Sequence, residues 1–229
     1  MNYIIIDSGT SSTKAFLFNS DGVVLHSQKI KPALFRPKQY HVESDALVIL
    51  ETCKSLFEKM VIASGDMPVH SSGLTIQRST FLFWEKESCT PVTPALSWQD
   101  SRAYAIVGEF STQSEQLWQI TGTPLGAHFG GPKFLHMIRE NPQLKNRVKN
   151  GELYFGPLSA FLSQAMTGTA GVEESIACRS LLYDIHRGDW SDFALNLFGV
   201  SPQCLPPLVP VKYDFGYMLD SKIPLAVVI

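Results

Sequence analysis

Short hydroxylated residues and one glycine follow the first apolar segment of the chain. Residues 7–14 read Asp-Ser-Gly-Thr-Ser-Ser-Thr-Lys, and β-type apolar residues flank them on both sides. A tight turn at this place points backbone N–H groups and hydroxyls toward one spot, which suits phosphate oxygens. Gly9 lacks the Cβ that would keep a phosphate away from the backbone, and Asp7 can hold a magnesium ion directly or through water. This pattern predicts a phosphate site with a metal at Asp7 and phosphate ligands at Gly9, Thr10, Ser11, Ser12 and Lys14.

The same segment differs from the two common nucleotide-binding motifs. It is neither a GxxxxGK[ST] loop before a helix nor a GxGxxG loop. A plain hairpin turn with solvated Ser and Thr explains it equally well, because Ser, Thr and Gly are common turn residues. The phosphate interpretation therefore needs support from other parts of the chain.

A second set of polar and aromatic residues lies in segment 77–100. Arg78 offers a rigid fork of donors, Trp98 a flat apolar face, and Asp100 an acceptor. A sugar or polyol requires hydrogen bonds to its hydroxyls and an apolar face against its C–H surface. A surface role for Arg78 and core packing of Trp98 remain open as alternatives at this point.

Alternating apolar runs and turns predict the elements that position these residues. Residues 2–6, 14–18 and 23–29 are expected to form hairpin strands, and Ser44 or Asp45 is expected to cap a helix at 46–63. Hairpin strands followed by strand–helix alternation predict a mixed α/β layer fold, in one domain. Further strands are expected at 69–76, 80–84, 96–98, 154–156, 181–185 and 223–229, and helices at 101–110, 112–120, 132–140, 158–166 and 189–198.

Composition narrows the class of protein. The net charge of −2 offers no basic surface for nucleic acid or an acidic membrane. The N-terminus has no basic leader, and no apolar run reaches the roughly 18 residues of a membrane helix, so we expect a cytoplasmic protein. The cysteines lie too far apart for a zinc or redox motif; they are Cys53, Cys89, Cys178 and Cys204.

Four motifs in order resemble the FGGY carbohydrate kinases, which include glycerol, gluconate and xylulose kinases. The first is segment 7–15 and the second pairs 73–80 with Trp-Gln-Asp-Ser-Arg at 98–102. The third is 121–133, and the fourth is Ala-Cys-Arg at 177–179 with the residues up to Ser191. The resemblance implies a ribonuclease-H-like (actin-like ATPase) domain, with a mixed sheet, N-terminal hairpin strands and flanking helices. It also implies ATP-dependent phosphorylation of a sugar or polyol hydroxyl, with ATP and Mg²⁺ as cofactors and a small sugar or polyol as partner; a homodimer stays open.

The same resemblance implies a set of substrate ligands. The Arg of the Gln-Arg motif and the Trp of the Trp-Gln-Asp motif line the polyol site in glycerol kinases. Glycerol kinases have Glu directly after that Arg, where this chain has Ser79, and Tyr where it has His128. Losing a carboxylate removes a strong charge-assisted hydrogen bond, so we expect a larger sugar or a sugar acid in place of glycerol. The predicted substrate ligands are Gln77, Arg78, Trp98, Asp100 and His128.

The family places its general base in a Gly-Asp-(Gln) motif directly after an apolar strand. Residues 223–229 resemble that strand, so we expect the base just after Ile229 and the adenosine-binding C-terminal domain outside residues 1–229. Because the chain ends in an apolar run, we expect this end to be an artificial boundary or the result of a truncated gene. We expect the N-terminal lobe alone to be inactive. A non-catalytic sugar-binding or regulatory module that reuses the lobe is the alternative function. A chaperone-like or actin-like ATPase is disfavoured by the Gln-Arg and Trp-Gln-Asp motifs.

Overall fold

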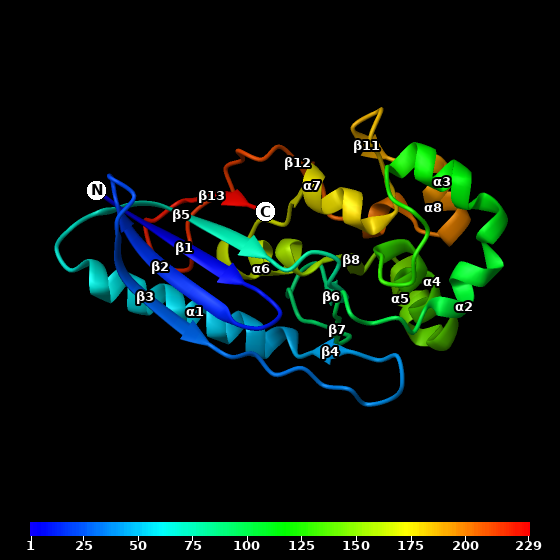
Figure 1. Cartoon of the computed structure of the whole chain (residues 1–229), viewed down its shortest axis with the longest axis horizontal. Helices are drawn as coiled ribbons and strands as arrows, with labels where there is room; N and C mark the ends of the chain where they lie inside the picture. Colours follow the sequence, from blue (N-terminus) through cyan, green and yellow to red (C-terminus); the bar gives the residue numbers. More distant parts are fainter.

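A mixed five-stranded sheet forms one end of the molecule (Figure 1) in a computed structural model that describes residues 1–229. The strand order is β13-β5-β1-β2-β3. The first three strands make two antiparallel hairpins, as predicted, and β5 pairs in parallel with both β1 and β13. The bounds are β1 Asn2–Ser8, β2 Thr13–Asn19, β3 Val24–Ile30, β5 Val69–Ile76 and β13 Leu225–Val228.

Alternation along β1 and β2 buries every second side chain of these strands against α1 (Ala46–Ser64), which covers one face of the sheet (Figure 1). The side chain of Asp45 accepts hydrogen bonds from the backbone N–H groups of Leu47 and Val48, so the predicted cap is Asp45. Leu47 itself is 49% exposed, so it lies outside the buried face of the helix. The buried face of α1 instead consists of Ala46, Ile49, Leu50, Cys53, Leu56, Phe57, Met60 and Ser64.

A second, antiparallel sheet has the strand order β4-β7-β6-β8. Its aromatic side chains form the centre of a second hydrophobic cluster, in which the rings of Phe83 and Phe155 lie 4.8 Å apart. The helix α6 (Leu158–Thr167) follows β8, and its buried side chains join those of β1, β2 and α1 in the first hydrophobic cluster, which fills the space beside the five-stranded sheet. The bounds are β4 Glu43–Ser44, β6 Phe81–Glu85, β7 Ala95–Leu96 and β8 Leu153–Pro157.

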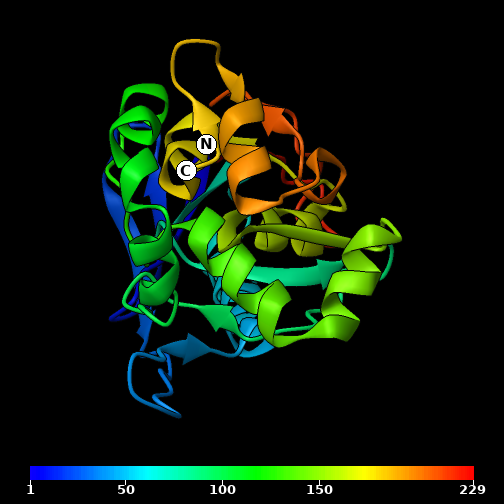
Figure 2. The same cartoon turned by 90° about the vertical axis from the view of Figure 1, so that its right-hand side faces the viewer.

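The remaining helices gather at the end of the molecule away from the five-stranded sheet (Figure 2). None of the helices in the chain combines the length and hydropathy that a membrane crossing requires. These helices are α2 Tyr104–Glu109, α3 Ser114–Thr121, α4 Gly130–Glu140, α5 Pro142–Lys149 and α8 Asp192–Phe198. Shorter elements complete the fold: α7 Glu174–Ala177, the paired strands β9 Val172–Glu173 with β12 Leu208–Val209 and β10 Tyr183–Asp184 with β11 Asp189–Trp190, and 3-10 turns at Ser111–Gln113, Cys178–Ser180 and Pro202–Cys204.

Several predicted boundaries are wrong for local reasons. The sequence predicts no element between the helix at 132–140 and the strand at 154–156, but α5 begins at Pro142. Proline at the first helical position is compatible with a new helix, and the side chain of Asn141 caps it by accepting from the N–H of Leu144. The strand expected at 181–185 is shorter, because Leu181 has a positive φ of 60°. The helix expected from 189 begins only after Ser191, whose side chain caps α8.

Close packing at the start of α4 requires glycine at position 131. A Cβ on Gly131 would lie 2.5 Å from the ring of Phe198. We expect Gly131→Ala to lower the free energy of unfolding by about 2 kcal/mol, because overpacking forces neighbours apart. Gly108→Ala is the matched control, since its Cβ meets open space within α2, and it should raise stability by up to about 1 kcal/mol. Urea unfolding followed by circular dichroism measures both; equal effects would contradict the packing argument.

Candidate functional site

A cavity of about 490 Å³ lies where the β1–β2 turn meets the residues that follow β5 and β7. Its lining comes from five separate segments of the chain and contains six of the residues predicted as ligands. The full lining is Gly9, Thr10, Gln77, Arg78, Ser79, Trp98, His128 and Arg179. The structure therefore brings the predicted phosphate turn and the predicted substrate residues to one place.

The β1–β2 turn is fixed by backbone hydrogen bonds. The N–H of Gly9 donates to the carbonyl of Ser12 at 3.0 Å, and a Cβ on Gly9 would come within 3.2 Å of that same oxygen. The N–H of Gln77 donates to the carbonyl of Ser8 at 2.9 Å, which ties the turn to the end of β5. Glycine is thus required for the tightness of the turn, and its backbone stays accessible from the cavity.

Thr10 connects the two halves of the cavity. The indole N–H of Trp98 donates to the Thr10 hydroxyl at 2.8 Å, and that hydroxyl donates to Oε1 of Gln77 at 2.8 Å. Trp98 is 46% exposed and belongs to neither hydrophobic cluster. Its ring is held by one polar contact at the edge, which leaves an aromatic surface free to meet a ligand.

A buried ammonium group supports the floor of the site. The Nζ of Lys133 donates to the carbonyls of Ser79 at 2.9 Å, Leu96 at 3.2 Å and Ser97 at 2.7 Å. Burial lowers the pKa of Lys133 to about 7, while the nearby Asp100 carboxylate raises it. The three carbonyls directly follow Arg78 or precede Trp98 along the chain, so Lys133 sets the relative position of these two side chains.

Arg179 lines the cavity, although it is not among the predicted ligands. Its guanidinium lies 4.7 Å from the ring centre of Phe129, and its Nε donates to the hydroxyl of Ser79 at 3.4 Å. Burial and the charge of Arg78 lower the pKa of Arg179. Arg179 belongs to the Ala-Cys-Arg motif at 177–179, but nothing in the sequence indicates that this motif lies beside the cavity.

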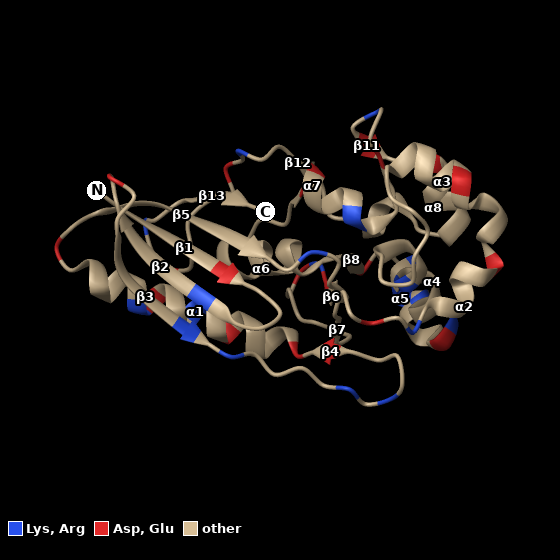
Figure 3. Cartoon of the chain, viewed as in Figure 1, with Lys and Arg blue, Asp and Glu red and all other residues tan.

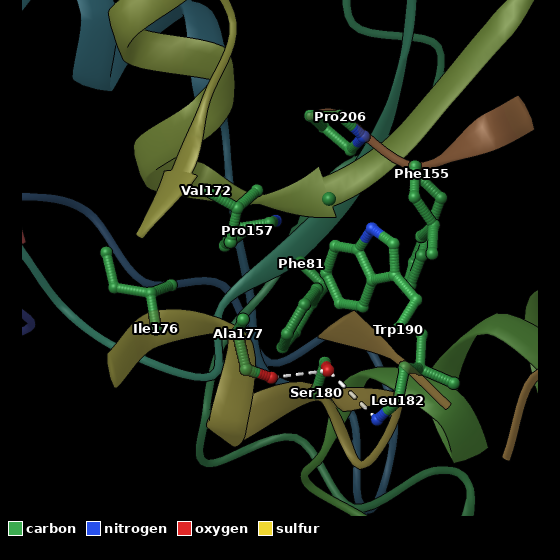
Figure 4. A pocket seen from close by; sticks show the side chains of 12 residues that line it. Phe81, Phe155, Pro157, Val172, Ile176, Ala177, Ser180, Leu182, Trp190 and Pro206 are labelled. Carbon is green, nitrogen blue, oxygen red and sulfur yellow. Dashed lines mark hydrogen bonds between the residues drawn. The ribbon is translucent and has the colours of Figure 1, made fainter. Parts of the chain in front are cut away.

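A small apolar cavity lies behind the turn that carries Arg179 (Figure 4), and hydrogen bonds of Ser180 hold this turn in place. The hydroxyl of Ser180 donates to the carbonyl of Ala177 at 2.5 Å and accepts from the N–H of Leu182 at 3.0 Å. The surrounding side chains are mainly apolar, with Phe81 and Trp190 among them, and the space amounts to about 10 Å³. A void of this size holds at most one water, so it is a packing feature and not a ligand site.

The other predicted phosphate ligands lie beside the cavity. Asp7 of β1 and Lys14 of β2 are register partners, with 3.7 Å between the carboxylate and the ammonium. Figure 3 shows an acidic stretch on β1 beside a basic stretch on β2. Ser11 is exposed and lines a neighbouring open cavity together with Thr10 and Trp98. Ser12 is 2% exposed, so it contributes its carbonyl to the turn.

The described residues contain no cluster of three His, Cys, Asp or Glu side chains that would hold a metal ion by themselves. Asp7 offers a single, partly exposed carboxylate next to the turn. Mg²⁺ in nucleotide sites keeps several waters and is bound by one or two carboxylates plus phosphate oxygens. Asp7 therefore fits a magnesium ion that arrives with a nucleotide, and it does not form a metal cage.

Asp100 is the predicted substrate ligand that the structure does not bring to the cavity. It is fully buried, and its carboxylate accepts from the N–H of Val42 at 2.7 Å and from the guanidinium of Arg102 at 2.8 to 3.0 Å. Arg102 also donates to Glu43. Because buried charges require such partners, Asp100 holds the turn after Trp98 against segment 40–43, and its oxygens are not free for a ligand.

Sequence comparison finds clear relatives. The chain matches the description "FGGY family of carbohydrate kinases, N-terminal domain" over residues 2–225. It is 30% identical over 221 residues to the glycerol kinase of Mycoplasma capricolum, covering 94% of this chain and 44% of that protein. Glycerol kinase 1 of Thermotoga maritima is 30% identical over 235 residues, covering 98% and 48%. The chain thus spans about half the length of the curated relatives it matches.

Solved structures show the same relationship. A Plasmodium falciparum glycerol kinase crystallised with ADP superposes with a TM-score of 0.94 at 25% identity, over 99% of this chain and 48% of that one. A gluconate kinase from Lactobacillus acidophilus superposes with a TM-score of 0.87 at 16% identity, over 100% and 48%. The second likeness shows the shared fold.

Removing the buried ammonium should destabilise the fold more than removing an exposed one. Lys133→Met keeps the length of the side chain but removes the Nζ donor from three buried carbonyls, of which that of Ser97 also accepts from the backbone N–H of Asp100. We therefore expect the free energy of unfolding to fall by about 3 kcal/mol. Lys145→Met on the exposed side of α5 is the control and should change it by less than about 0.5 kcal/mol. Chemical denaturation measures both, and similar losses for the two variants would contradict the role of Lys133.

His128 should titrate below its ordinary pKa. Burial lowers the pKa of His128 from 6.5, and the positive charges of Lys133 and Arg179 lower it further. Since the unfolded chain then binds the proton more readily, protonation of His128 should reduce stability as the pH falls below about 6.5. An NMR titration of the imidazole Cε1–H, assigned by its absence in His128→Gln, measures the value; a midpoint at or above 6.5 would refute the expectation.

Proposed function

Because the chain belongs to the FGGY family of carbohydrate kinases, we propose that it is the N-terminal lobe of an ATP-dependent kinase that phosphorylates a hydroxyl group of a sugar or polyol. The main support is the Thr10 hydroxyl, which links the glycine turn to Trp98 and Gln77 inside one cavity. Phosphoryl transfer requires donor and acceptor to meet at one place. A phosphate turn and an aromatic, arginine-bearing surface that share a cavity satisfy this requirement.

On the nucleotide side, we assign the turn to the terminal phosphates of ATP. Gly9 allows a phosphate to approach the turn closely, and the exposed hydroxyl of Ser11 is free to donate to it. The hydroxyl of Thr10 would donate to a phosphate in exchange for its bond to Gln77. Asp7 would hold Mg²⁺, which neutralises phosphate charge when it is bound, and Lys14 beside it adds a further positive charge. Ser12 shapes the turn through its carbonyl.

On the acceptor side, Trp98 offers its face to the C–H surface of the substrate, and Arg78, Gln77 and His128 offer polar groups to its hydroxyls. In the reaction, a substrate hydroxyl oxygen forms a bond to the γ-phosphorus while the bond to the β–γ bridging oxygen breaks and ADP leaves. The hydroxyl proton passes to a base. Asp100 is too well bound to Arg102 to serve as that base, so we assign it the role of positioning Trp98.

We place the general base and the adenosine-binding domain in a second lobe. The support is the length of the relatives, of which this chain covers 44% to 48%. A glycerol kinase of similar structure was crystallised with ADP, which supports ATP as the phosphoryl donor. Lobe closure would exclude water, which otherwise competes for the phosphoryl group. Residues 1–229 alone are therefore expected to lack kinase activity.

The test is a coupled ADP-release assay on the full-length protein with ATP, Mg²⁺ and a panel of polyols, pentoses, hexoses and sugar acids. Thr10→Val keeps the shape of the side chain but removes the hydroxyl that joins Trp98 to Gln77. We expect kcat/KM to fall by about 30-fold, which corresponds to about 2 kcal/mol of transition-state stabilisation. Thr52→Val in α1 is the control and should retain the activity of the parent protein. Absence of ADP release with every compound would overturn the proposed function and favour a non-catalytic binding module.

A further inference from the structure

The cavity is positively charged and contains no carboxylate. Arg78 and Arg179 both line it, and the other six lining residues carry no negative charge. Neither arginine takes part in any ion pair of the chain. Arg179 donates only from Nε, to Ser79, so the remaining donors of its guanidinium have no acceptor. Two like charges at one cavity favour an anionic ligand, because guanidinium and carboxylate groups form strong bidentate pairs.

The two carboxylates in the motifs that supply the cavity are already bound elsewhere. Asp7 lies against Lys14 on the adjacent strand, and Asp100 is fully buried against Arg102. Neither can move to Arg78 or Arg179 without leaving its partner. Neither carboxylate neutralises the two arginines, so both guanidinium groups are free to bind an anionic ligand.

The remaining lining residues restrict what that ligand can be. Trp98 offers an exposed ring, and Gln77, Ser79 and His128 offer uncharged polar groups, since burial keeps the pKa of His128 low. A small inorganic anion would leave the indole face unused. A ligand with one anionic end and a chain of hydroxylated carbons would use the arginines, the polar groups and the ring together.

We propose that the acceptor substrate is a polyhydroxy carboxylic acid whose carboxylate is bound between Arg78 and Arg179 and whose carbon chain lies along Trp98. This inference rests on the proposed function and specifies its substrate class. The residue that makes the site selective is Ser79, because it is small and neutral where a longer acidic side chain would pair with Arg179. The hydroxyl of Ser79 lies 3.4 Å from the Arg179 Nε, which shows how directly this position controls the charge of the cavity.

The experiment compares substrates that differ in one group. D-gluconate and D-glucitol share the same hydroxylated chain, with a carboxylate in the first and a CH₂OH group in the second; D-glycerate and glycerol form a shorter pair. With the full-length protein, we take the acid that has the lower KM of the two. We expect its KM to be at least about tenfold below that of its neutral counterpart, since a charge-assisted bidentate pair is worth more than about 1.4 kcal/mol.

Arg179→Gln removes one charge of the carboxylate site. We expect it to raise the KM for the acid by about tenfold or more and to affect the neutral counterpart less. Arg187→Gln is the control, because Arg187 is an exposed arginine that pairs with Asp192, and it should leave the acid preference intact. If Arg179→Gln raises the KM for ATP and not that for the acid, the arginines bind the nucleotide phosphate and the inference is wrong.

Ser79→Glu tests the selectivity directly. A carboxylate at position 79 should pair with Arg179 and shift the preference toward the neutral compound, whereas Ser79→Gln has the same size without the charge and should keep the preference for the acid. Thermal unfolding of both variants shows whether they fold. A preference that changes equally in Ser79→Glu and Ser79→Gln would overturn the role assigned to charge.

The outcomes separate the inference from the function on which it rests. If the KM values for the neutral compounds are no higher than those for the matched acids, the kinase function stands and the inference falls. If it phosphorylates nothing, the proposed function falls, and calorimetric titration of the same protein with gluconate and glucitol still decides the inference. Binding of gluconate no tighter than that of glucitol would then overturn it.

Discussion

The candidate site depends on one buried ammonium group. Lys133 lies in the first turns of α4 and donates three hydrogen bonds to carbonyls that flank Arg78 and Trp98. A buried charge is tolerated only when such partners replace water, so the carbonyls and the ammonium hold each other in place. Because α4 itself packs tightly against Phe198 at Gly131, Lys133 holds the backbone next to Arg78 and Trp98 against the helical end of the molecule.

A second set of hydrogen bonds connects the segment of Trp98 to the five-stranded sheet. The hydrogen bonds from Trp98 to Thr10 and from Thr10 to Gln77 join the β1–β2 turn to the segment after β5. Asp100 and Arg102 form a buried pair just behind Trp98 and keep its turn against segment 40–43. Polar contacts therefore position the site, while the two hydrophobic clusters supply the surfaces on which it is built.

Electrostatics then decides which ligands the cavity favours. Asp7 is compensated by Lys14, and Asp100 is compensated by Arg102, but Arg78 and Arg179 are not compensated by any residue of the chain. Arg179 has no charged partner because the side chain next to its Nε is the neutral hydroxyl of Ser79. Burial first, and then the positive charges of Lys133 and Arg179, lower the pKa of His128, so its imidazole favours the neutral form.

Local patterns in the sequence determined much of this protein by themselves. Alternation and turn residues defined the hairpin strands β1 to β3 and the helix α1, and the ordered motifs identified the family and its mixed α/β, actin-like ATPase fold. Only the tertiary structure decided which motif residues face the cavity, because Thr10 meets Gln77 and Trp98 across separations of 67 and 88 residues. Spacing along the chain does not encode such contacts. For that reason Asp100, which the motif suggested as a ligand, is a buried ion-pair partner, and Arg179, which no spacing singled out, lines the site.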